Sequence, residues 1–386
     1  MTRVLVTGAD GFLGRNLSAR LSVVDGLELM GVDAQTPEAK LDEALKQCDI
    51  VFHFAAVNRS KDPDDFRRIN CDFTRQLCRK LIDWRRSPRI IFSSSIQAVL
   101  NNSYAISKRE AEDVLLQYAA QTGAVVRIYR LKNLFGKWAR PEHNSVVATF
   151  CYNTSRDLPI RVSDPKTEVA LLYVDDVVDA FLLEIGPTAP AVTGLVDTDP
   201  LPAHSLALGE LAGTIQSFRE MRENLLLPNF AMPFHRELYA TYLSYVPETA
   251  RETRLQAKRD SRGSLAEFLK SKEAGQIFLS RTLPGIVRGN HYHHTKTEKF
   301  FVLEGDGLLR MRQIQSREVV EYRLCGRDYQ VVDIPPGYTH SIQNVGTGEM
   351  ITLFWASEIF NPDRPDTYYL PVDGSVQPST SRAGGQ

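Results

Sequence analysis

A glycine-rich turn near the start of the chain constrains the fold most strongly. The apolar run Val4–Val6 leads into Thr7–Gly14, in which three glycines are spaced three residues apart, and a helical pattern follows. Glycine at a strand-to-helix turn permits a tight bend and close approach of the backbone to a pyrophosphate, and the helix N-terminus attracts the phosphate charge. The turn therefore predicts a dinucleotide-binding βαβ unit. The residues of this turn that we expect at the cofactor are Gly8, Gly11, Phe12, Leu13 and Gly14.

Short β-branched runs alternate with longer helical patterns over about the first 185 residues. This alternation is typical of a doubly wound parallel sheet with helices on both faces. Residues 186–204 are rich in Pro, Thr, Ala and Asp and predict a surface excursion, and residues 205–226 return to helical spacing. The first domain should therefore cover residues 1–247. Its candidate strands are Val4–Val6, Leu29–Val32, Ile50–Phe54, Arg89–Phe92 and Val125–Arg130.

The sequence pattern changes at about residue 250, where short alternating strands are separated by turns with Gly and Pro. This pattern predicts an all-β barrel or sandwich over residues 248–373. Residues 374–386 have almost nothing to bury and should be disordered. The candidate strands of the second domain are Gln276–Leu279, Lys299–Leu303, Leu308–Ile314, Glu318–Leu324, Gln330–Ile334 and Met350–Ala356.

The charge balance points to a small-molecule partner. Lys and Arg number 46 against 47 Asp and Glu, without long blocks of one sign, so neither nucleic acid nor an anionic membrane is expected as a partner. The five cysteines are scattered and form no Cys-x-x-Cys pair, which predicts reduced thiols. The chain has no signal-peptide core and no apolar stretch of membrane-spanning length, so we expect a cytoplasmic protein.

Several polar residues follow the predicted strands of the first domain. Asp33 ends the second strand, where an acidic side chain accepts hydrogen bonds from an adenosine ribose, although an Asp can also simply start a turn. Ser94 and Ser95 follow the fourth strand. Tyr104 and Lys108 lie four apart on one helical face, so the ammonium could lower the phenol pKa and make the tyrosine a proton donor. A single pair of this kind could also be accidental.

These features together resemble the extended short-chain dehydrogenase/reductase family. By that resemblance Tyr104 is the proton donor, and Lys108 holds the nicotinamide ribose and tunes Tyr104. Ser95 positions the substrate carbonyl, with Ser94 as its rival. Asn133 faces the diphosphate of a nucleotide sugar, and Ala55 and Ala56 line the cofactor. The resemblance rests on Thr7–Gly14, His53–Ala56, Ser93–Ser95, Tyr104 with Lys108, Arg130–Gly136 and Tyr173–Asp176.

The second domain contains a set of candidate metal ligands. His291 and His293 are one residue apart and project from the same face of a strand, and Glu298 follows a turn later. A Pro-Gly turn delivers His340 after another strand. This N/O ligand set suits a divalent metal, with zinc as the first choice and iron or manganese as alternatives. The histidines could instead form hydrogen bonds inside a polar barrel.

These two blocks resemble the cupin motifs, which implies a double-stranded β-helix. The first motif matches in every spaced position, whereas the second lacks its leading glycine. His294, Lys296 and Tyr338 are close in sequence to the ligands and are candidate bases, among which the residues alone do not choose.

Nearly the whole chain, over residues 1–372, resembles the CapF-type family of capsular-polysaccharide and O-antigen enzymes. The resemblance implies a homodimer that epimerises C3 of UDP-2-acetamido-2,6-dideoxy-4-hexulose in the cupin and then reduces C4 in the first domain. The product would be UDP-N-acetyl-6-deoxy-L-talosamine, on the route to UDP-N-acetyl-L-fucosamine. The stretches that carry this resemblance include Ala56–Arg59, Ser93–Ala98, Asn133–Trp138, Asn144–Val146, Tyr239–Pro247, Gly289–Phe300, Trp355–Ala356 and Pro365–Tyr368.

The cofactor implied by the resemblance is NADP(H), but Asp33 would repel a 2′-phosphate and favour NAD(H). Arg15, just after Gly14, could offset that repulsion. Three other functions remain open: a keto-sugar reductase whose cupin only dimerises or binds substrate, a non-catalytic dinucleotide or sugar sensor, and a cupin with dioxygenase chemistry of its own.

Overall fold

The computed structural model describes residues 1–374, which form two compact units. Unit 1 comprises Met1–Arg219 and Pro233–Glu248, and unit 2 comprises Glu220–Met232 and the chain from Thr249 onward. The segment Glu220–Met232, which the sequence pattern places in the first domain, groups with unit 2 because it pairs with a strand there. The amide of Leu227, for example, donates to the Lys270 carbonyl at 2.8 Å. The disorder expected for residues 374–386 falls, from residue 375 on, outside the described residues.

A six-stranded parallel sheet forms the centre of unit 1. All five predicted strands are present in it, with ends shifted by a few residues. The fourth strand extends further than expected because Ser93–Ser95 continue its ladder against Tyr129–Leu131. In spatial order the strands are β2 (Leu27–Val32), β1 (Thr2–Thr7), β3 (Ile50–His53), β4 (Arg89–Ser95), β5 (Val126–Leu131) and β8 (Gly194–Leu195).

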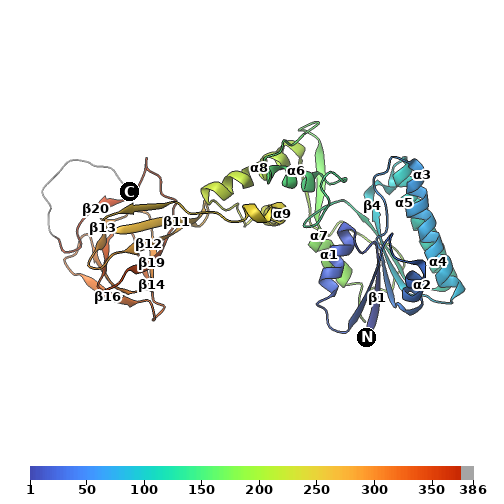
Figure 1. The fold of residues 1–386 in the computed structure, drawn as a ribbon, viewed down its shortest axis with the longest axis horizontal. Coiled ribbons are helices and arrows are strands. Elements are labelled where there is room, and N and C mark those ends of the chain that lie inside the picture. The colour runs from blue at the N-terminus through green and yellow to red at the C-terminus, as the bar shows by residue number, and fades with distance from the viewer. Residues whose placement is uncertain (375–386) are drawn as a thin grey trace. The chain divides into compact units, whose positions relative to one another are not determined.

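Helices cover both faces of this sheet, as Figure 1 shows. One face packs against α1 (Phe12–Leu21) and α7 (Val174–Leu182), and the other against α2 (Glu38–Gln47), α4 (Phe73–Asp83) and α5 (Ser103–Thr122). Alternate residues of each strand enter opposite cores: Leu5 belongs to one, whereas Val4 and Val6 belong to the other. The predicted doubly wound parallel fold is therefore confirmed.

Further strands and helices lie outside the central sheet and the five helices that cover it. A second sheet contains β6 (Asn133–Phe135), β7 (Glu168–Tyr173) and β9 (Ala203–Ala207). The predicted surface excursion at 186–204 contains β8, and the expected helix at 205–226 is α8 (Leu208–Asn224). The other helices and helical turns are α3 (Pro63–Asp65), η1 (Phe66–Asp72), η2 (Ile96–Val99), α6 (Val146–Thr154), α9 (Pro233–Tyr245) and η3 (Glu248–Ala250).

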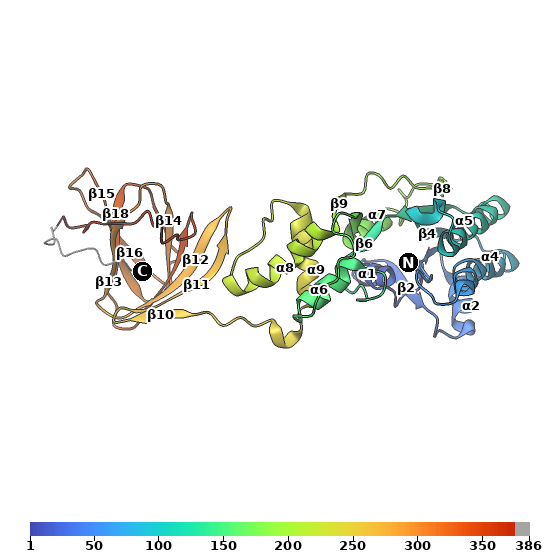
Figure 2. The ribbon, with the colours of Figure 1, turned by 90° about the horizontal axis from the view of Figure 1, so that it is seen from above.

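Two antiparallel sheets build unit 2, which confirms the all-β prediction (Figure 2). Phe300 and Phe354 of one sheet and Leu309 and Ile342 of the other belong to one buried core. The first sheet has the order β10 (Ala257–Asp260), β11 (Gly263–Ser271), β12 (Gly275–Thr282), β19 (Met350–Ala356), β14 (Glu298–Glu304) and β17 (Val331–Ile334). The second has the order β16 (Val320–Cys325), β15 (Asp306–Gln313), β18 (Tyr338–Asn344), β13 (Val287–Tyr292) and β20 (Tyr368–Tyr369).

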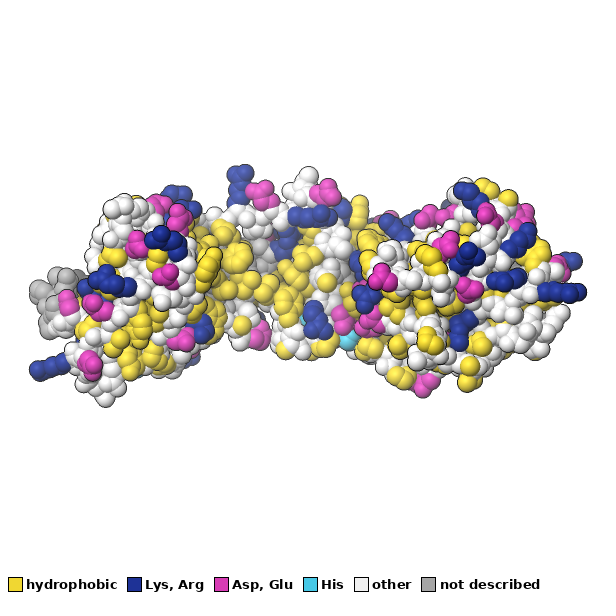
Figure 3. All heavy atoms as spheres, turned by 90° about the horizontal axis from the view of Figure 1, so that it is seen from below, with side chains coloured by type: hydrophobic (Ala, Val, Ile, Leu, Met, Phe, Trp, Pro, Cys, Tyr) yellow, Lys and Arg dark blue, Asp and Glu magenta, His cyan; other side chains and the backbone are white. Residues whose placement is uncertain are grey.

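The surface of each unit carries charges of both signs. On the face drawn in Figure 3, basic and acidic side chains are interspersed, as the balanced composition predicts. Among the described residues, no helix combines the length and the apolar character that crossing a membrane requires.

Candidate active site and metal centre

The glycine turn after β1 is packed so closely that side chains would not fit. Gly8 has a φ of +70°, and a Cβ there would lie 2.8 Å from the Ala55 amide nitrogen. A Cβ on Gly14 would lie 2.1 Å from the Gly8 carbonyl oxygen. Gly11 precedes the first turn of α1, which no side chain of the described chain caps. The first amides of α1 are therefore available to a phosphate.

This turn borders a pocket of about 1410 Å³ in unit 1. The pocket brings together most of the residues predicted for the first domain. Asp33 and Ala55 are not among the lining residues. The backbone of Ala55 instead packs against Gly8 of the glycine turn. The predicted residues that line the pocket are Gly8, Gly11, Phe12, Leu13, Gly14, Ala56, Ser94, Ser95, Tyr104, Lys108 and Asn133.

Asp33 instead interacts with Asp10, which lines the pocket. A hydrogen bond with Asp33, together with the repulsion between the two carboxylates, raises the pKa of Asp10. Arg15 partly opposes this repulsion, and its guanidinium carbon lies 5.8 Å from the centre of the Trp138 ring. The Asp10 carboxylate, which the sequence pattern did not single out, adds to the negative charge beside Asp33.

Tyr104 and Ser95 lie next to each other at the pocket. Burial raises the pKa of Tyr104, and a hydrogen bond with Ser95 partly offsets the effect. The Ser95 hydroxyl also accepts from the Gln97 amide at 3.1 Å, which fixes its position at the end of β4. The two hydroxyl groups could therefore contact one carbonyl oxygen of a substrate.

Lys108 is buried one helical turn beyond Tyr104. Its Nζ donates to the Ser93 carbonyl at 2.8 Å and lies 4.6 Å from the centre of the Phe92 ring. Burial lowers the pKa of Lys108 to about 8, and Glu112 acts in the opposite direction. At neutral pH Lys108 therefore still carries most of its charge.

The two rival serines point to different surroundings. The Ser94 hydroxyl is buried and donates to Oε1 of Glu112 at 2.5 Å. Arg130 binds the same carboxylate with two donors, at 2.9 and 2.5 Å. Ser94 also lines the pocket, but its hydroxyl is bound within a buried network with Glu112 and Arg130, whereas Ser95 faces Tyr104. The regular spacing of Tyr104, Lys108 and Glu112 on α5 was a sequence signal for this network.

Arginines from distant loops also line the pocket. Arg59, Arg140 and Arg161 come from three different segments, and Arg59 donates to the Glu142 carbonyl at 3.1 Å. Their charge suits a diphosphate. Arg59 lies in the recognised stretch Ala56–Arg59, but no role was predicted for any of the three arginines, because their segments are far apart in the sequence.

The four predicted metal ligands converge in unit 2. One ligand atom from each of His291, His293, Glu298 and His340 lies within 4.8 Å of the others. Among residues 1–374, Nε2 of His293, Nε2 of His340 and Oε2 of Glu298 are buried, and they have no polar partner apart from one another. Buried polar atoms are rarely unsatisfied, so three that converge suit a cation.

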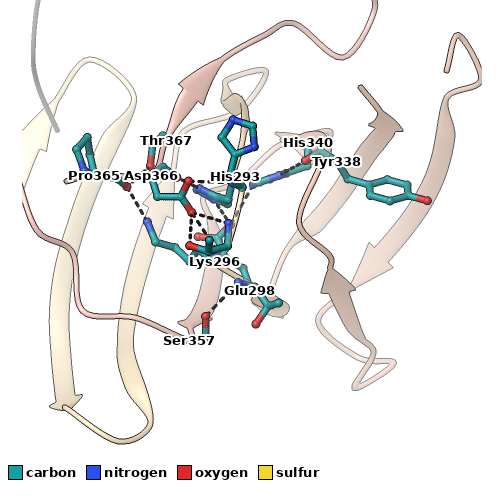
Figure 4. Close-up of polar contacts among 12 residues, drawn as sticks. His293, Lys296, Glu298, Tyr338, His340, Ser357, Pro365, Asp366 and Thr367 are labelled. Atoms are coloured by element: carbon teal, nitrogen blue, oxygen red, sulfur yellow. Dashed lines mark hydrogen bonds and ion pairs between the residues drawn. The ribbon is translucent and has the colours of Figure 1, made fainter. Parts of the chain in front are cut away.

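Hydrogen bonds outside the cluster turn two of the rings toward its centre (Figure 4). Nδ1 of His293 donates to the Asp366 carbonyl at 2.5 Å, and Nδ1 of His340 donates to the Tyr338 carbonyl at 3.2 Å. The Nε2 atoms of His293 and His340 face Glu298, at 3.2 and 3.0 Å from its Oε2. Hydrogen bonds such as those of the two Nδ1 atoms fix the tautomer that a metal requires.

Two residues of the cluster have shifted pKa values that favour the forms a metal binds. Burial and the neighbouring His340 lower the pKa of His291 to about 3, so its ring is neutral. Burial alone would raise the pKa of Glu298, but His293 and His340 hold it below its usual range. Neutral imidazoles and an ionised carboxylate are the forms that bind a divalent metal.

The three candidate bases have different surroundings. His294 is exposed, and its ring centre lies 4.8 Å from that of Tyr368. The Tyr338 ring extends away from the cluster in Figure 4. Lys296 is buried, and its Nζ donates to the Pro365 carbonyl at 3.0 Å.

Comparison with known proteins matches both units. Residues 4–187 match the NAD dependent epimerase/dehydratase family, and residues 258–368 match the polysaccharide biosynthesis C-terminal domain. The chain is 40% identical over 371 residues to the UDP-2-acetamido-2,6-beta-L-arabino-hexul-4-ose reductase of Pseudomonas aeruginosa, covering 96% of this chain and 99% of that relative. The crystal structure of the capsular polysaccharide assembling protein CapF from Staphylococcus aureus is 40% identical, with a TM-score of 0.87, and the match covers 96% of this chain and all of that one. The chain belongs to the CapF family.

Another structure of the CapF family contains the inhibitor 3-isopropenyl-tropolone. It is 38% identical to this chain, with a TM-score of 0.82, and the match covers 96% of this chain and all of that one. Membership of the CapF family confirms the predicted resemblance, the fold class and an enzyme of the NAD(P)-dependent epimerase and reductase type.

Proposed function

We propose that this chain epimerises C3 and then reduces C4 of UDP-2-acetamido-2,6-dideoxy-4-hexulose. The product would be UDP-N-acetyl-6-deoxy-L-talosamine, on the route to UDP-N-acetyl-L-fucosamine. One observation carries the proposal: the same chain holds the Ser95–Tyr104 pair beside a glycine turn and a buried histidine–glutamate cluster in a different unit. The C3 proton is acidic only while C4 is a ketone, so epimerisation must come before reduction.

The reduction step would use unit 1. A reduced nicotinamide bound at the glycine turn would supply the hydride to C4. The Tyr104 hydroxyl would donate its proton to the C4 oxygen, and the Ser95 hydroxyl would hold that oxygen in place. Lys108 would bind the nicotinamide ribose. Asn133 and the pocket arginines would hold the diphosphate of the substrate.

The epimerisation step would use unit 2, which we assign as a cupin. His291, His293, Glu298 and His340 fit a divalent metal, because their donor atoms converge and three of them have no polar partner in the described chain apart from one another. We assign the metal as zinc. It would supply either polarisation of the C4 oxygen or structural support.

The cofactor follows from the charges at the glycine turn. The resemblance implies NADPH, but Asp10 and Asp33 together disfavour a 2′-phosphate, and Arg15 only partly offsets them. We therefore propose that the chain accepts both NADH and NADPH. We also propose that it acts as a cytoplasmic homodimer.

A single incubation tests the proposed function. The purified chain is mixed with UDP-2-acetamido-2,6-dideoxy-4-hexulose and NADPH, while cofactor absorbance and the proton NMR spectrum of the sugar are followed. We expect oxidation of the cofactor together with inversion at C3. The absence of both cofactor oxidation and any change in the sugar would contradict the proposal.

A second candidate is a simple reductase that receives an already epimerised sugar. It is favoured by the name of the Pseudomonas aeruginosa relative, which describes reduction of an L-arabino 4-ketone and mentions no epimerisation. Repeating the incubation with the already epimerised sugar separates the two candidates. A simple reductase would oxidise cofactor only with the epimerised substrate and would leave C3 unchanged.

A further inference from the structure

The C-terminal strap, residues 365–372, lies against the proposed metal centre. Its β20 pairs with β13, where Tyr369 is opposite His291. The Leu370 amide donates to the Asn290 carbonyl at 2.8 Å, and the buried Arg312 donates to the Val372 carbonyl at 2.8 Å. The strap is therefore held by the same sheet that carries two of the histidines.

Asp366 connects the strap to the loop between the metal ligands. Its Oδ1 accepts from the His294 amide at 2.9 Å, and its Oδ2 accepts from the amides of Thr295 and Lys296 at 3.0 Å each. The Thr295 hydroxyl adds a further bond at 3.0 Å. One carboxylate thus fixes three consecutive amides between His293 and Glu298, as Figure 4 shows.

The backbone of Asp366 also contacts a ligand directly. Its carbonyl accepts from Nδ1 of His293 at 2.5 Å, which leaves Nε2 toward the cluster. Asp366 has a φ of +41°, a left-handed conformation that a residue with a side chain rarely adopts. Such strain persists only where the surroundings enforce it. The carboxylate contacts enforce it here, and they aim the carbonyl at the histidine.

We infer that Asp366 is a positioning residue of the metal centre, which holds His293 in the tautomer and orientation that bind metal. The inference rests on the metal centre of the proposed function. Nothing near residue 366 in the sequence is a ligand, so the strap would bring a part of the site from about 70 residues away. A role limited to stabilising the loop would not require the contact with the ring.

Zinc affinity tests this role without an activity assay. We would measure the Kd for zinc of full-length protein by competition with a chelating dye, for the wild type and for Asp366→Asn. An amide nitrogen in place of one carboxylate oxygen would face backbone N–H donors. We expect zinc binding to weaken by about 10- to 100-fold, the usual effect of losing a group that orients a ligand. Asp363→Asn, at an exposed position three residues before Asp366, should leave the Kd unchanged.

A double-mutant cycle distinguishes ligand positioning from general loosening of the fold. In a His293→Ala background, Asp366→Asn should weaken zinc binding no further, because its target ring is gone. In a His340→Ala background it should still weaken binding by about 10- to 100-fold. Equal effects in both backgrounds, or no effect in the wild type, would overturn the inference. If Asp366→Asn fails to fold, Thr295→Val removes one bond to the same carboxylate and takes its place in the cycle.

The two proposals fail in different ways. A wild-type chain that binds no zinc or other divalent metal would overturn the metal centre itself, and the role of Asp366 with it. A wild-type chain that binds zinc and is insensitive to Asp366→Asn would overturn only the role of Asp366.

Discussion

The two candidate sites of this chain are built in opposite ways. The site in unit 1 is formed largely by backbone at a glycine turn and opens into a pocket of about 1410 Å³. The cluster in unit 2 is formed by four side chains whose ligand atoms lie within 4.8 Å of one another. The first suits a large dinucleotide and a sugar, whereas the second suits a single ion. Because the two sites share no residue, a change that disables one site should leave the other active.

The largest expected effect is that of Tyr104→Phe on reduction. The change removes the proton donor to the C4 oxygen, so cofactor oxidation should fall by about 10²- to 10⁴-fold. Cofactor binding should be retained, because the glycine turn is unchanged. The measurement is sugar-dependent loss of NADPH absorbance, with cofactor binding followed by fluorescence. Turnover at the wild-type rate would remove Tyr104 from the mechanism.

The matching change in unit 2 is His291→Ala. Loss of a ligand should reduce bound zinc and slow C3 epimerisation by more than about 100-fold, since even groups that only orient ligands have effects of that order. Reduction of an already epimerised sugar should continue at the wild-type rate. Metal analysis and a reduction assay on both sugars test this separation. Parallel loss of both activities would contradict the independence of the two sites.

A smaller effect is expected from the buried network of Ser94, Glu112 and Arg130. Glu112 raises the pKa of Lys108, and burial lowers it to about 8. Glu112→Gln should lower this pKa further, so the ammonium is lost at lower pH and the alkaline limb of the kcat profile moves toward acid. A shift on the order of one pH unit is expected. The neighbouring His53 is neutral, because burial lowers its pKa to about 3. It therefore adds no second positive charge beside Lys108.

Asp113→Asn is the control for this change, since Asp113 is an exposed carboxylate on the same helix. Its pH profile should match the wild type. An unchanged alkaline limb in Glu112→Gln would show that Glu112 does not set the charge on Lys108.

The smallest effect concerns the choice of cofactor. Asp33→Ala removes one of two carboxylates near the expected 2′ position, so the ratio of kcat/KM for NADPH over NADH should rise. A partly exposed charge contact contributes about 1 kcal/mol, which corresponds to a several-fold change. A strong NADPH preference that Asp33→Ala leaves unchanged would argue against this role of Asp33.

Sequence patterns predicted the local parts of both sites. The glycine turn is contiguous, and the histidine pair with its following glutamate lies within eight residues, so their spacing alone carried the prediction. The choice between Ser94 and Ser95 required the structure, because it depends on the Glu112–Arg130 pair. Asp366 was part of a recognised stretch but had no predicted role, since its partners lie about 70 residues away.

The sequence pattern also did not predict where the boundary between the two units lies. Residues 205–226 have continuous helical spacing, which says nothing of the neighbours that the end of the helix contacts. The structure groups Glu220–Met232 with unit 2, where Leu226 pairs with Lys270. A chain cut at about residue 250 would lack this segment, so tests of unit 2 should use the intact protein.

Proton exchange at C3 tests the independence of the two sites most directly. Full-length Tyr104→Phe, loaded with zinc and free of nicotinamide cofactor, is incubated with the 4-keto sugar in deuterated water, and the C3 proton signal is followed by NMR. We expect exchange at the wild-type rate in this variant, and none above background in His291→Ala. Exchange that requires NADPH, or that disappears with Tyr104→Phe, would contradict the assignment of epimerisation to unit 2.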